Sequence, residues 1–161
     1  MDPGISFATL LAYNIEENDH WKRWFEGHPA ALDLACDVAG AGTVRKLLLH
    51  IFSTELVFAC LVLDQDRPHF ANLPQTTLDE LFAIGADARA KFEEFLAKSK
   101  PEDWNTPRPM GFRDIKASKA KMMMQAIWHS INHRSQMATF LRQQGFKQDW
   151  IHDFILSKVM E

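Results

Sequence analysis

Three histidines are the residues of this chain whose type and spacing are best suited to chemistry. His129 and His133 lie four residues apart in a segment with helical periodicity, and His50 lies on the apolar stripe of an earlier helical segment. Residues four apart on a helix differ in direction by only about 40°, so His129 and His133 point the same way. Three imidazole ligands leave at least one coordination position of a metal open, which is typical of a catalytic site.

A divalent metal would satisfy ring nitrogens that burial would otherwise leave unpaired. Zinc and nickel both suit imidazole ligands, and the spacing does not choose between them. The alternative is that these histidines bind no metal. A His-x-x-x-His pair can arise by coincidence, and a single histidine on an apolar face is usually a satisfied core residue.

Four long segments with helical periodicity must position these histidines, and strand signals are scarce. Thr43 and either Thr76 or Thr77 are the predicted N-caps, and Gly145 is suited to follow the last helix. Residues 149–158 are predicted to form a short helix or an extended tail. We therefore predict an all-α four-helix bundle with helices over residues 6–26, 43–63, 77 to 98 or 100, and 118–144.

The histidines fall on stripes that we expect to face the interior of the bundle. One polar residue, Asn14, also falls on the inward stripe of the first helix, where it could orient a bound water or substrate. A buried asparagine bonded to the backbone is an equally good interpretation. The two stripes comprise Leu47, His50, Thr54, Val57 and Leu61 in one helix, and Met122, Ala126, His129, His133, Met137 and Phe140 in the other.

The linker between the second and third helices bears on connectivity. A helix of 21 residues is about 32 Å long, whereas the linker over residues 64–76 can extend to about 43 Å. The linker can therefore cross the whole bundle, which permits the second and third helices to run parallel.

Composition excludes several function classes. The chain has 161 residues, which we interpret as one domain over residues 1–161, and its net charge of -3 does not favour a nucleic-acid partner. Two cysteines do not form a disulfide framework, and no apolar run reaches the roughly 18 residues of a membrane span. We expect a cytoplasmic protein without membrane attachment.

The histidine segments resemble a known family. From Ile127 the chain reads I-W-H-S-I-N-H-R-S-Q-M-A-T-F-L-R-Q-Q-G, which resembles the last helix of DinB-like proteins, where H-x-x-x-H-R-G-Q precedes L-R-Q-x-G. Residues 43–55, T-V-R-K-L-L-L-H-I-F-S-T-E, resemble the second helix of that family. Ser135 replaces the usual glycine of H-R-G-Q. The replacement costs little helix stability, but it could reduce the space for close packing around Arg134.

The resemblance implies a four-helix bundle with up-down-down-up topology. It maps the family's metal ligands onto His50, His129 and His133, and it implies a homodimer. Relatives in the wider superfamily use low-molecular-weight thiols such as bacillithiol or mycothiol together with a divalent metal.

Two hypotheses about function follow. The first is a metal-dependent enzyme of thiol S-transferase type, or a hydrolase, that acts on a small-molecule substrate. The second is a stress-response or interaction module that holds a metal without turnover. A metal-free interaction bundle would require all three inward histidines to be accidental.

Overall fold

Four long helices make up most of the chain. The computed structural model describes residues 5–100, 102, 104–111 and 114–160. Each helix begins and ends within one residue of the predicted bounds, which confirms the all-α bundle. The helices are α1 (Phe7–Gly27), α2 (Val44–Val62), α3 (Leu78–Lys98) and α4 (Lys119–Gln143). Among the described residues, none of the helices combines the length and hydropathy needed to cross a membrane.

The helix ends follow from local side-chain chemistry. The Thr43 hydroxyl accepts a hydrogen bond from the backbone N–H of Lys46, and Ser118 caps α4 in the same way. Thr77, rather than Thr76, caps α3 and forms a capping box with Glu80. Gly145 adopts a positive φ of 86° directly after α4, as the sequence predicted.

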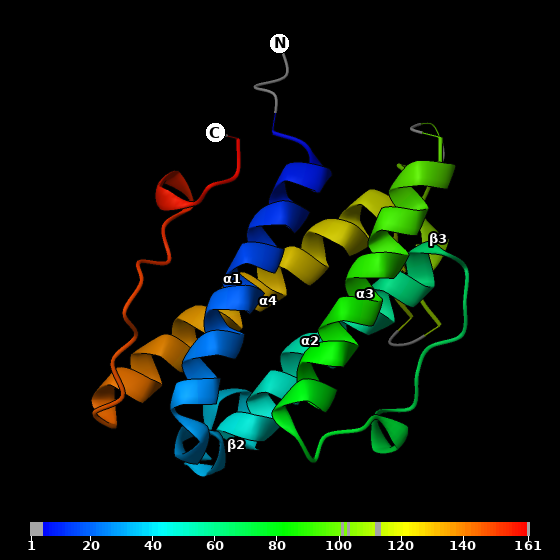
Figure 1. Ribbon diagram of the computed structural model, residues 1–161. Helices are drawn as coiled ribbons and strands as arrows, with labels where there is room; N and C mark the ends of the chain where they lie inside the picture. The colour runs from blue at the N-terminus through cyan, green and yellow to red at the C-terminus, as the bar shows by residue number, and fades with distance from the viewer. Residues whose placement is uncertain (1–4, 101, 103, 112–113, 161) are drawn as a thin grey trace.

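The long crossover is present. In Figure 1, α1 and α4 run in one direction, whereas α2 and α3 both run in the other, and the chain between Val62 and Leu78 returns along the outside of the bundle. This is the up-down-down-up topology. Short 3-10 turns lie in the connections and in the C-terminal tail; those in the described residues include η1 (Pro29–Asp33), η2 (Val38–Gly40), η3 (Phe70–Asn72) and η5 (Phe154–Leu156).

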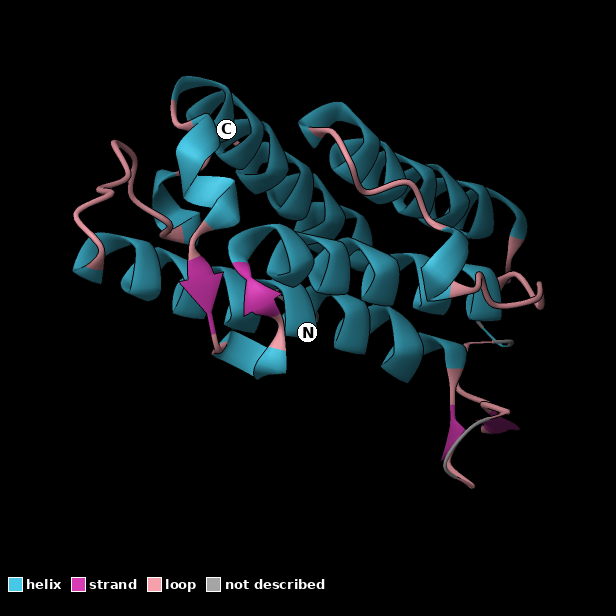
Figure 2. Cartoon of the chain, turned by 90° about the horizontal axis from the view of Figure 1, so that it is seen from below, coloured by secondary structure: helices cyan, strands magenta, loops and turns pink. Residues whose placement is uncertain are grey.

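Two short antiparallel ribbons were not predicted. The strands β1 (Ala35–Cys36) and β2 (Gly42–Thr43) pair before α2, and β3 (Arg108–Pro109) and β4 (Lys116–Ala117) pair before α4. They lie at different ends of the bundle (Figure 2). Strands of two residues are too short to show apolar alternation, which explains why sequence reading interpreted both segments as loops.

The C-terminal segment is an extended tail that lies along α1. The Trp24 Nε1–H donates to the Lys147 carbonyl, and further along the Tyr13 hydroxyl donates to the His152 carbonyl at 2.6 Å. The buried carboxylate of Glu17 bonds Trp150 Nε1 and His152 Nδ1. The tail therefore runs antiparallel to α1 and covers its outer side (Figure 1).

The centre of the bundle is α2, which packs against both α3 and α4. The α2–α3 contact depends on a glycine. A Cβ built on Gly85 would lie 2.8 Å from Cδ1 of Phe52, whose ring is fully buried. The absence of a side chain at Gly85 therefore lets the two helices approach closely.

Gly85→Ala is expected to lower the free energy of unfolding by about 1–2 kcal/mol. Overpacking against a buried ring costs about 1–3 kcal/mol, and the better helix propensity of alanine recovers up to about 1 kcal/mol. Urea denaturation of both proteins measures the difference. Gly27→Ala is the matched control, because nothing lies within 4 Å of a Cβ placed there. Equal stability of the Gly85→Ala and wild-type proteins would contradict the packing argument.

Candidate metal centre

Helices α2 and α4 bring the three predicted histidines together. One possible ligand atom from each of His50, His129 and His133 lies within 4.8 Å of the others. The ring centroids of the three imidazoles are 4.3 to 5.0 Å apart. His50 comes from α2, and the other two come from successive turns of α4, as their spacing predicted.

The distances between the rings fit a shared cation. The Nε2 atoms of His50 and His129 are 3.0 Å apart. Two nitrogens bound to one ion at about 2.0–2.1 Å are about 3–3.4 Å apart in octahedral or tetrahedral geometry. The group contains no carboxylate or thiolate among the described residues. A cation there would have three neutral ligands and at least one open position.

Gln136 orients one of the rings. The Nδ1 atom of His133 and the Oε1 atom of Gln136 are 2.7 Å apart. An amide oxygen only accepts, so this contact places the proton of His133 on Nδ1 and leaves the Nε2 lone pair for a metal. Gln136 was not among the site residues predicted from the sequence. Its position three residues after His133, on the same side of the helix, is the signal that could have revealed this role.

Burial and crowding keep two of the rings unprotonated. Burial, with smaller contributions from the nearby rings of His133 and His50, lowers the pKa of His129 to about 4. Burial also lowers the pKa of His50, with His133 contributing. A ring whose pKa lies below 6.5 is unprotonated at neutral pH, so His50 and His129 present lone pairs rather than protons to a metal.

The predicted orientation of the histidines is confirmed only in part, because all three are partly exposed rather than buried. Met122, Ala126 and Met137 of the predicted α4 stripe are buried. The neighbouring line of α4 is buried as well: Met123, Ile127, Ser130, Arg134, Ala138 and Leu141. The buried face of α4 is therefore wider than the predicted stripe and includes polar residues that the stripe left out.

A buried polar network occupies the interior next to the histidines. Glu55 is 3% exposed and Arg134 is 4% exposed. The Oε1 atom of Glu55 accepts hydrogen bonds from Ser130 Oγ at 2.5 Å and Asn14 Nδ2 at 3.0 Å, with Arg134 Nη2 at 3.4 Å. Arg134 also donates to the side-chain oxygens of Asn14 at 2.5 Å and Asn18 at 2.6 Å. Three helices thus share one carboxylate.

Comparison with known proteins bears on this arrangement. A sequence model of the DinB family matches residues 4–157, which is nearly the whole chain. The chain belongs to the DinB family. No curated protein matches it. Membership agrees with the resemblance carried by the α2 and α4 motifs.

In this DinB-family chain, the network sets the register of the histidines. Ser130 directly follows His129, and Arg134 directly follows His133. Both bond to Glu55, which lies on the same helix as His50. Holding Ser130 and Arg134 against Glu55 therefore fixes the rotation of α4 about its axis. This rotation in turn places the two histidines beside α2.

Asn14 is buried as predicted, but its partners are side chains rather than the backbone. Its amide nitrogen bonds Glu55 and its oxygen bonds Arg134. None of these contacts reaches the histidines. Asn14 therefore acts as a member of the network, and its proposed role in orienting a metal-bound ligand gains no support from these contacts.

Glu55→Gln is expected to lower the free energy of unfolding by about 3–5 kcal/mol, because it leaves the Arg134 charge buried without its counter-ion. Guanidinium denaturation of the metal-free protein measures the loss. Glu93→Gln removes an exposed ion pair with Arg89 and serves as control, with an expected cost below about 1 kcal/mol. A loss below about 1 kcal/mol for Glu55→Gln would show that the network does not hold α4 in register with α2.

Proposed function

We propose that this chain is a metal-dependent enzyme that transfers a low-molecular-weight thiol to an electrophilic small molecule. His50, His129 and His133 would hold the ion. The observation that carries the proposal is the convergence of three partly exposed imidazoles without an anionic ligand in the group. Such a site leaves coordination positions open and reachable from solvent.

The residues of the site have separable tasks. A divalent cation bound there would supply Lewis acidity, which lowers the pKa of a thiol or water in contact with it. The Gln136 amide fixes the ring of His133, and the Glu55 network holds α4 in register. The unprotonated rings of His50 and His129 do not repel an incoming cation, as protonated rings would.

The transfer itself is a substitution at the electrophile. The thiol loses its S–H proton to solvent, and the thiolate sulfur forms a new S–C bond. The bond from that carbon to the leaving group breaks, and the leaving group departs with the electron pair. The partly exposed position of the histidines supports this reaction, because both substrates can approach without opening the bundle core.

Zinc and nickel are the proposed ions, since both accept imidazole ligands. The homodimer implied by the family resemblance and the cytoplasmic location also remain predictions. Exposed apolar side chains on the C-terminal tail, including Ile151, Ile155 and Leu156, support an interface between two copies.

Metal binding should depend on the histidines of α4. Untagged wild-type protein is expected to carry about one ion per chain by elemental analysis. In His129→Ala/His133→Ala the affinity should fall by more than about 100-fold, because even changes to residues behind the ligands cost about 10–100-fold. His69→Ala, an exposed histidine elsewhere, is the control. Unchanged stoichiometry in the double variant would remove the metal assignment.

Thiol transfer should depend on the metal. Bacillithiol, mycothiol and glutathione are each incubated with a chromogenic aryl halide, with zinc, nickel or a chelator, and conjugate formation is followed. We expect conjugation only with metal and wild-type protein, since the open coordination position activates the thiol. Tight metal binding with neither conjugation nor thiol-dependent protection against melting would favour the non-catalytic metal-binding module instead.

A further inference from the structure

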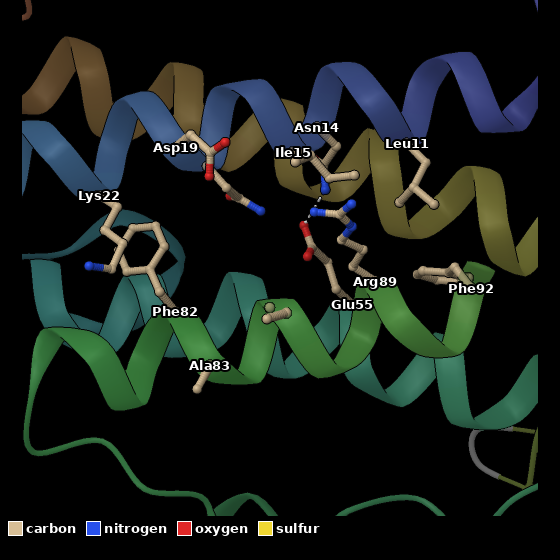
Figure 3. A pocket seen from close by; sticks show the side chains of 13 residues that line it. Leu11, Asn14, Ile15, Asp19, Lys22, Glu55, Phe82, Ala83, Arg89 and Phe92 are labelled. Carbon is tan, nitrogen blue, oxygen red and sulfur yellow. Dashed lines mark hydrogen bonds between the residues drawn. The ribbon is translucent and has the colours of Figure 1, made fainter. Parts of the chain in front are cut away.

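A second candidate binding site lies between α1 and α3. A cavity of about 270 Å³ opens there, and none of the three histidines lines it. Its walls are largely apolar, and Asn14 of α1 and Glu55 of α2 supply polar groups (Figure 3). The apolar part is formed by Leu11, Ile15, Phe82 and Phe92.

Glu55 offers this cavity an oxygen that the protein does not use. Its hydrogen bonds with Asn14, Ser130 and Arg134 all fall on Oε1. Within the described part of the chain, Oε2 has no hydrogen-bond partner. The residue is 3% exposed, yet it lines the cavity. This oxygen is not among the fully enclosed side-chain atoms that lack a partner, so it is accessible from the cavity, where a donor can bond it.

Arg134 does not saturate this carboxylate. Its guanidinium makes its shortest hydrogen bonds, at 2.5 and 2.6 Å, to the amide oxygens of Asn14 and Asn18, whereas it lies 3.4 Å from Glu55. Arg134 is also absent from the residues that line the cavity. Charge-assisted hydrogen bonds to a carboxylate are shorter than this contact, at about 2.7–2.9 Å.

The rim leaves a second carboxylate available. Two cations line the cavity, but each is paired outside it: Lys22 with Glu26 and Asp79, and Arg89 with Glu93. Asp19 also lines the cavity, is exposed, and has no hydrogen bond or ion pair among the described residues. Asp19 therefore supplies an unpaired carboxylate at the rim, whereas the charge of Glu55 is paired with Arg134 and only its Oε2 atom lacks a hydrogen bond.

We propose that this cavity binds a small primary amine as its ammonium ion. The ammonium group donates to Glu55 Oε2, and a short apolar tail packs between Leu11, Phe82 and Phe92. The volume lies below the usual range for drug-sized ligands, so the ligand has about ten non-hydrogen atoms. The site is separate from the histidine centre, and its existence does not depend on the thiol-transfer function.

The test measures binding of phenethylammonium to the full chain by calorimetry and protein-observed NMR. The expected dissociation constant is on the order of 1 mM, as suits a ligand of this size. Two compounds of similar shape, 2-phenylethanol and 3-phenylpropanoate, should bind at least about tenfold more weakly, because they lack the charge-assisted hydrogen bonds. Equal binding of the amine and the alcohol, or no saturable amine binding at about 10 mM, would overturn the proposal.

Variants locate the bound amine. Ala86 lines the cavity and is exposed on α3, so Ala86→Leu should fill the space and weaken amine binding by at least about tenfold. Ala90→Leu is the matched control, because Ala90 is exposed on the same helix and does not line the cavity. Ile15→Phe fills the space from α1 and replaces Ala86→Leu if the latter fails to fold. Unaltered binding by a folded cavity-filling variant would contradict the assignment.

One further variant separates this site from the metal centre. His129→Ala/His133→Ala should bind the amine as tightly as the wild-type protein does, with or without a chelator. Loss of amine binding in that variant would place the ligand at the histidines and overturn the proposal. Failure of thiol transfer, by contrast, would leave the amine result unaffected, because the histidines of the metal centre do not line the cavity.

Discussion

The arrangement of this bundle depends on how it accommodates one buried carboxylate. The Glu55 side chain lies in the interior, where an unpaired charge would cost several kcal/mol. Arg134 supplies the opposite charge, and Ser130 and Asn14 supply hydrogen bonds. These partners come from α1 and α4, while Glu55 comes from α2. The Oε1 atom of Glu55 therefore keeps these partners only when three helices keep one relative register, which is also the register that brings the histidines together.

Local signals were sufficient to predict the elements. Thr43 and Thr77 have hydroxyls that satisfy free backbone N–H groups, and Gly145 tolerates a positive φ, so each position carried its own physical reason. The linker was long enough to span the bundle, so the sequence allowed α2 and α3 to run parallel but did not require it. The convergence of His50 with His129 and His133 followed from the family resemblance and from helical spacing together.

The full interior face of α4 could not be predicted, and the reason is physical. A polarity-based stripe treats arginine and serine as surface residues, so it included Met122, Ala126 and Met137, which are buried, but left out Ser130 and Arg134. In the folded chain, Arg134 and Ser130 are buried because Glu55 lies opposite them. Burial of a charge depends on a partner from a distant part of the chain, 79 residues away in this case. No single-helix pattern contains that information.

The same carboxylate lies between two pairs of helices. Its Oε1 oxygen ties α2 to α4, which pack closely along the side that carries the histidines. Glu55 also lines the cavity between α1 and α3, whose mutual packing is less extensive. A metal centre needs ligands held within a few tenths of an ångström, so the closely packed pair suits it. The looser contact between α1 and α3 leaves the space in which a small ligand can bind. One side chain can serve both regions because it bonds α4 through Oε1 and also lines the cavity.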